Sequence, residues 1–210
     1  MFVDRIDAGR QLAKALAAYK GQKPLILAIP RGAVPMGKVI ADALEGELDV
    51  VLVRKLTSPY SSEFALGSVD ESGWMFVADY AAESGGTPEY MEREKQRQMA
   101  TLRARREQYT PFRQALDAKG RVAIVIDDGL ATGSTMIAAL HATRAKQPEK
   151  LICAVPVAPP DTLEKIRPYC DELVCLSAPP YFQAVGQFYS DFNQVSDEEV
   201  MEVLRQAHGV

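Results

Sequence analysis

The sequence lacks the features that would direct a chain to a membrane, to nucleic acid or to an oxidising compartment. No apolar stretch approaches the ~20 residues that a membrane-spanning helix requires. The formal net charge is -4, which gives no electrostatic reason to expect a nucleic-acid partner. The N-terminus lacks the apolar core of a signal peptide, and the chain has only 3 cysteines. We therefore expect a cytoplasmic protein that binds neither nucleic acid nor membranes.

Histidine and cysteine, which often serve as metal ligands or catalysts, are also scarce. The 2 histidines, His141 and His208, fall in expected helices without acidic or hydroxyl partners nearby in sequence. Cys153 lies in an apolar strand, while Cys170 and Cys175 have no partner ligands at zinc spacing. These absences disfavour a phosphate-ester hydrolase, because such an enzyme needs a nucleophile or a His/Asp metal cluster.

Residues 121–136, by contrast, have the order of a buried strand, a polar loop and a helix start. Val122–Ile126 is an unbroken apolar run, which is typical of a parallel strand covered on both faces. Asp127 and Asp128 follow where this strand ends. A loop of small and hydroxyl residues comes next, and an apolar helix face begins at Met136.

The chemistry of this loop suits a phosphate ester of a sugar. Its glycines and the hydroxyls of Thr132, Ser134 and Thr135 would accompany free backbone N–H groups at the positive end of a helix dipole. Two carboxylates beside an anion site would face something else, either a pair of hydroxyls or a divalent cation that accompanies the phosphates. A ribose 5-phosphate presents both needs. The alternative is an ordinary strand-to-helix turn of another α/β protein.

The same stretch resembles the phosphoribosyl pyrophosphate (PRPP) signature of type I phosphoribosyltransferases. The resemblance implies that Asp127 and Asp128 are the catalytic acids that hold the ribose hydroxyls, directly or through Mg²⁺. The two carboxylates would bind this Mg²⁺ cofactor directly or through water. The loop would wrap the 5-phosphate with Ala131, Thr132, Gly133, Ser134 and Thr135.

Two further strand ends carry the cations that a pyrophosphate group would need. The expected strands 24–29 and 49–53 are followed by Arg31, Gly32, Arg54 and Lys55. Taken alone, these residues could form a surface turn and a solvated pair. In the family that the sequence resembles, a similar Arg-Gly loop binds pyrophosphate, and a similar Val-Arg-Lys ending reaches it.

The remaining strands and helices alternate along most of the chain. Strands are expected at 151–157 and 173–176, and helices at 7–19, at 161–169 behind an Asp-x-x-Glu cap, and from Ser196 onward. This order predicts right-handed crossovers and one doubly wound, mainly parallel α/β sheet flanked by helices. The loops above would lie at its carboxyl edge, within a single phosphoribosyltransferase-like domain over 1–210.

An insertion at about 56–120 interrupts the alternation. It begins with the polar, turn-rich segment 57–62, a candidate mobile loop over the site. A hairpin around 70–73 follows, and then a long polar helix from Pro88 to about Tyr109. We interpret Arg103, Arg105 and Arg106 of this helix as a solvated face or an oligomer contact.

The segment at about 177–210 is expected to form a small C-terminal hood. Aromatic residues concentrate in 177–192, and Tyr181 and Phe182 resemble the start of the hood over the acceptor base in oxopurine enzymes. Ala131, however, stands where those enzymes carry a proton-accepting Asp. Adenine-type members also have Ala there, in agreement with Val-Arg-Lys. The acceptor therefore stays open.

These observations predict a phosphoribosyltransferase, a pentosyl-type glycosyltransferase of nucleotide metabolism. It would transfer the 5-phosphoribosyl group from PRPP to a nitrogenous small-molecule acceptor and release pyrophosphate, as a homodimer or higher homo-oligomer. The alternative is a non-catalytic PRPP- or nucleotide-binding regulator on the same fold.

Overall fold

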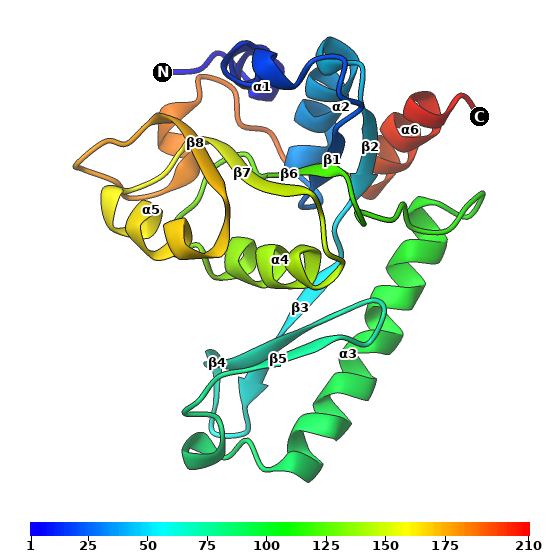
Figure 1. The fold of residues 1–210 in the computed structure, drawn as a ribbon. Helices are drawn as coiled ribbons and strands as arrows, with labels where there is room; N and C mark the ends of the chain where they lie inside the picture. Colours follow the sequence, from blue (N-terminus) through cyan, green and yellow to red (C-terminus); the bar gives the residue numbers. More distant parts are fainter.

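The computed structural model describes residues 1–210 and contains two separate sheets (Figure 1). The larger sheet has five parallel strands in the order β2-β1-β6-β7-β8. They are β1 (Leu25–Ala28), β2 (Glu47–Val50), β6 (Val122–Ile126), β7 (Lys150–Val157) and β8 (Glu172–Ser177). The smaller, antiparallel sheet consists of β3 (Val53–Ser58), β4 (Ser61–Asp70) and β5 (Met75–Val77).

Helices cover both faces of the five-stranded sheet. One face packs against α1 (Arg5–Ala15), α2 (Ala33–Leu44) and α6 (Asp197–His208), and the other against α4 (Ser134–Ala145) and α5 (Pro160–Ile166). Short 3₁₀ turns lie at Ala17–Tyr19, Ala82–Ser84, Arg167–Tyr169 and Val185–Phe188. The predicted doubly wound α/β fold is therefore confirmed.

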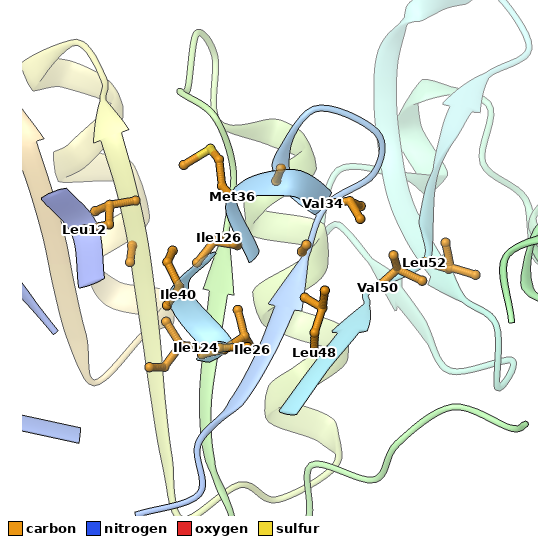
Figure 2. Close-up of a cluster of buried hydrophobic side chains, with 14 of the residues drawn as sticks. Leu12, Ile26, Val34, Met36, Ile40, Leu48, Val50, Leu52, Ile124 and Ile126 are labelled. Carbon is orange, nitrogen blue, oxygen red and sulfur yellow. The ribbon is translucent and has the colours of Figure 1, made fainter. Parts of the chain in front are cut away.

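Alternation along the central strands explains this double covering. Ile26 and Ile124 point to the α2 side, where Figure 2 shows them packed with side chains of α1 and α2. Their neighbours Leu25 and Ala123 belong to the cluster on the α4 side. Because successive strand residues face opposite sides, only an unbroken apolar run can fill both cores. Each buried Leu or Ile side chain contributes about 1.5–3 kcal/mol to this packing.

The order of the strands places a switch point between β1 and β6. From β1 the chain passes through α2 to β2 on one side, while from β6 it passes through α4 to β7 on the other. The loops that leave β1 and β6 therefore diverge to opposite faces. In open α/β sheets a ligand crevice forms at this position, outside the carboxyl ends of the strands.

The third predicted strand differs from the structure. β2 ends at Val50, and the chain crosses to the small sheet, where β3 begins at Val53. The apolar residues Val51 and Leu52 pack against the two cores as a connection, so their hydrophobicity does not extend the strand. Arg54 and Lys55 accordingly lie within β3, not at the end of a strand of the large sheet.

Three other predictions are corrected in detail. Segment 57–62 is the end of the β3–β4 hairpin, not an open loop. Strand β8 is only half-buried, because it lies at the edge of the sheet. The expected Asp161 cap is absent, since α5 begins at Pro160 after Pro159 and has no side-chain cap.

The insertion forms an arm made of the small sheet and the long helix α3 (Pro88–Tyr109), which lies below the large sheet in Figure 1. The start of α3 agrees with the prediction, since Thr87 Oγ1 accepts a hydrogen bond from the Tyr90 N–H and Pro88 occupies the first turn. Helix α4 packs against both sheets and so joins the arm to the core. No helix in the chain has the length and apolar character needed to cross a membrane.

Candidate active site

The loops after β1 and β6 meet at the switch point. Gly32, at the start of α2, approaches Asp128 so closely that a Cβ atom there would lie 2.2 Å from Asp128 Oδ2. Only glycine permits this approach without displacing the carboxylate. The structure thus brings the predicted Arg31-Gly32 loop directly beside the predicted acid pair.

The acid pair is held from several sides. The Asp128 N–H donates to Asp127 Oδ1 at 2.8 Å, and the Tyr189 hydroxyl donates to the Asp128 carbonyl at 2.6 Å. Arg5 Nε donates to Asp128 Oδ2 at 3.0 Å. Burial, together with the neighbouring Asp128 carboxylate, raises the pKa of Asp127 well above its ordinary value. The pair therefore favours a cation or hydroxyl donors beside it.

The loop after the acid pair is open to an anion. Gly133 adopts φ +78°, a left-handed conformation that favours glycine, and α4 begins at the next residue without a side-chain cap. The first turn of α4 contains no acidic residue. Thr162 Oγ1 fixes the loop by donating to the Ala131 carbonyl at 2.6 Å. Uncapped N–H groups at a helix start suit an anion. That 131–135 bind a phosphate stays a prediction.

The predicted cations come from different elements, since Arg31 precedes α2 and Arg54 and Lys55 belong to β3. Arg31 lies 3.8 Å from Asp197 at the start of α6. Lys55 Nζ donates to Ser134 Oγ at 3.4 Å, which places β3 beside the 131–135 loop. Arg54 Nε donates to Gln98 Oε1 of α3 at 3.0 Å. Arg31 and Gly32 line a cavity together with Asp128, whereas Arg54 and Lys55 line a neighbouring cavity together with Pro30 and Thr135.

The hood approaches the acid pair through other residues than those predicted. The Tyr181 side chain is 87% exposed, and Phe182 packs on Phe188 with ring centroids 5.1 Å apart. Phe192 instead lies against Arg5, whose guanidinium carbon is 4.0 Å from the ring centroid. A cavity of about 360 Å³ between Phe192, Gln194 and the Gly32–Asp128 contact opens beneath the hood.

Arg5 and Tyr189 are site residues that sequence reasoning missed. Arg5 lies 123 positions before Asp128 in the sequence, and Tyr189 lies 61 positions after it. No local motif marks either residue. Their contacts arise because the start of the chain and the hood pair beside each other, with a bridge between Phe2 and Tyr189.

The chain thus combines a doubly wound parallel sheet with adjacent carboxylates and an uncapped helix start at its switch point, as a phosphoribosyltransferase of the α/β class requires. Residues 4–193 match the family model of the phosphoribosyl transferase domain. The chain belongs to this family.

Individual relatives agree with this assignment. Two proteins of Mycobacterium tuberculosis, from strains CDC 1551 / Oshkosh and ATCC 25618 / H37Rv, are named provisionally as phosphoribosyl transferases and are 40% identical over 211 residues. These matches cover 99% of this chain but 47% of each relative, so the chain spans about half the length of the curated relatives it matches. The crystal structure of TT1426 from Thermus thermophilus is 43% identical, with a TM-score of 0.90 and 98% coverage of both chains.

Proposed function

We propose that the protein transfers the 5-phosphoribosyl group of PRPP to a nitrogenous acceptor and releases pyrophosphate. The observation that carries the proposal is the contact between the acid pair and the Arg31-Gly32 loop, beside an uncapped helix start. A ribose with a phosphate at one end and a pyrophosphate at the other needs these three features next to one another. The proposal treats residues 1–210 as one domain, with the insertion and the hood as parts of it.

Each predicted residue receives a role in this proposal. The loop residues Ala131, Thr132, Gly133, Ser134 and Thr135 bind the 5-phosphate through N–H groups and hydroxyls. Asp127 and Asp128 hold the ribose hydroxyls. The pyrophosphate lies against Arg31, Gly32, Arg54 and Lys55. Because the leaving pyrophosphate gains negative charge while the ribose ring gains positive charge, cations on one side and carboxylates on the other stabilise the transition state.

The acid pair also suits an Mg²⁺ ion that binds together with the phosphates of the substrate. No group of three or more His, Cys, Asp or Glu side chains forms a metal cage in the chain. Mg²⁺ is commonly bound through one or two carboxylates, water and substrate phosphates, so Asp127 and Asp128 suffice as its protein contribution. When bound, the ion neutralises charge on the leaving group.

The acceptor is proposed as a small nitrogenous molecule beneath the hood, with Tyr181 and Phe182 as its tentative contacts. Tyr181 faces solvent, so the hood would have to close to bring the Tyr181 side chain against a ring of the acceptor. We also propose that the protein forms a homo-oligomer and that it resides in the cytoplasm.

A PRPP-binding regulator is the second candidate, and two observations favour it. Asp128 is engaged by Arg5, and Ala131 supplies no proton acceptor. A regulator would bind PRPP without base-dependent release of pyrophosphate.

The proposal is tested with the double variant Asp127→Asn, Asp128→Asn. It should lose PRPP binding and pyrophosphate release across a panel of purine and pyrimidine bases while the chain still folds, because asparagine keeps the size of the carboxyl group and its oxygen can still accept the hydrogen bonds from Arg5 Nε and from the N–H of residue 128. The matched control is Asp161→Asn with Glu164→Gln, two exposed carboxylates on α5. Clear unfolding of the acid-pair variant would assign the pair a structural role and contradict the proposal.

A further inference from the structure

A cavity of about 380 Å³ lies between β3, α3 and the first turn of α4. It adjoins Pro30, the residue before Arg31, and Thr135 of the phosphate loop, so it borders the site described above. Its charged lining residues are Arg54, Lys55 and Arg105, and no Asp or Glu lines it. The third of these cations comes from the inserted helix.

The three cations of this cavity have no carboxylate partner. None of the ion pairs in the chain includes Arg54, Lys55 or Arg105. The adjacent Arg106, by contrast, pairs with Asp49 and Glu71. Uncompensated cations around one cavity create a positive potential that a multiply charged anion relieves.

Helix α3 is linked to both segments that carry the predicted pyrophosphate cations. The Tyr109 hydroxyl donates to Asp197 Oδ1 at 2.8 Å, and Asp197 lies 3.8 Å from Arg31. Gln98, which lines the same cavity as Arg105, accepts the hydrogen bond from Arg54. The helix that carries Arg105 is thus tied to the elements that carry Arg31 and Arg54, and its position relative to them is defined.

We propose that Arg105 binds the pyrophosphate group of PRPP, so that the inserted helix completes the leaving-group end of the site. This inference rests on the proposed function and extends it to a residue of the arm. It replaces the interpretation of Arg105 as part of a solvated face.

The test compares Arg105→Gln with wild-type protein by calorimetric titration of pyrophosphate, PRPP and ribose 5-phosphate, each in the presence of Mg²⁺. Loss of one charge-assisted contact should weaken pyrophosphate and PRPP binding about 10-fold or more. Ribose 5-phosphate, which lacks the leaving group, should bind as it does to the wild type. Arg103→Gln is the matched control, because Arg103 is an exposed cation on the same helix that does not line the cavity.

Two results would overturn the inference. Pyrophosphate binding by Arg105→Gln equal to that of the wild type would exclude the contact. An equal loss of ribose 5-phosphate binding would show a general disturbance of the site instead.

Failure of the proposed function has a different signature. If wild-type protein binds pyrophosphate through Arg105 but binds neither PRPP nor ribose 5-phosphate, the transferase proposal fails while the pyrophosphate contact is supported.

Discussion

Arg106 joins the arm to the core through a buried ion cluster. Its Nη1 donates to Asp49 Oδ1 at 2.8 Å, and its Nε and Nη2 donate to Glu71 at 2.9 and 2.7 Å. Asp49 is only 1% exposed, and its Oδ2 also accepts the Leu116 N–H. The guanidinium thereby connects β2, the β4–β5 turn and α3. The expectation that Arg106 is part of a solvated face is wrong.

Arg106→Ala should lower the free energy of unfolding by about 3–5 kcal/mol, because it leaves a buried carboxylate without its closest cation. Urea denaturation measures this change. The control Arg103→Ala, at an exposed position of the same helix, should stay within about 0.5 kcal/mol of the wild type. A loss in Arg106→Ala as small as that of the control would contradict a stabilising role for this cluster.

Single residues differ in how far the sequence reveals them. Asp127 and Asp128 are recognisable because strand, acids and loop follow one another within a short stretch. Arg5 is not, since its partner Asp128 lies 123 positions away. Arg105 and Arg106 are adjacent in sequence, yet one lines a cavity and the other is buried in ion pairs. Their helix repeat alone does not tell which neighbours each will meet.

At the scale of elements, an aromatic cluster joins the arm to α4. His141 of α4 stacks on Phe76 of β5 with ring centroids 4.0 Å apart, and the ring centroid of Tyr169 lies 4.8 Å from that of His141. His141 Nε2 is buried and makes no hydrogen bond within the chain. Burial lowers the pKa of His141, so the folded protein keeps this ring neutral.

This arrangement predicts a pH dependence of stability. The unfolded chain protonates His141 near its ordinary pKa of about 6.5, while the folded chain resists protonation to a lower pH. The stability that the folded protein gains from keeping His141 neutral is therefore complete above about pH 6.5. It is lost as the pH falls toward the pKa that His141 has in the folded protein. His141→Phe, which keeps a ring but removes the titration, should reduce the slope of unfolding free energy against pH between 6.5 and the acid range. An unchanged slope, measured by urea denaturation at each pH, would refute this account.

The start of α3, which has a strong local signal, agrees with the sequence, whereas the bounds of β2 and β3, which tertiary contacts set, do not. Helix α3 starts at Pro88 after Thr87, as the cap predicts. The early end of β2 and the departure of β3 to a second sheet have no such signal, because Val51–Val53 is apolar in either case. Residues that pack as a connection between sheets look like a strand in the sequence.

For the whole molecule, the alternation of strands and helices predicts the doubly wound sheet, and the edge on which the site lies follows from it. The pairing of the first residues with the hood does not follow. Phe2 bridges to Tyr189, and Arg5 reaches Asp128 from the same end of the chain. These contacts close one side of the crevice over the acid pair. A local sequence pattern cannot predict them, because they join segments that lie far apart in the sequence.

Every role proposed for the site residues requires that the switch-point crevice binds PRPP. Calorimetric titration of the protein with PRPP, with and without Mg²⁺, measures this binding. We expect saturable binding that is stronger with Mg²⁺, because the acid pair and the phosphates share the ion. Absence of PRPP binding under both conditions would contradict these roles.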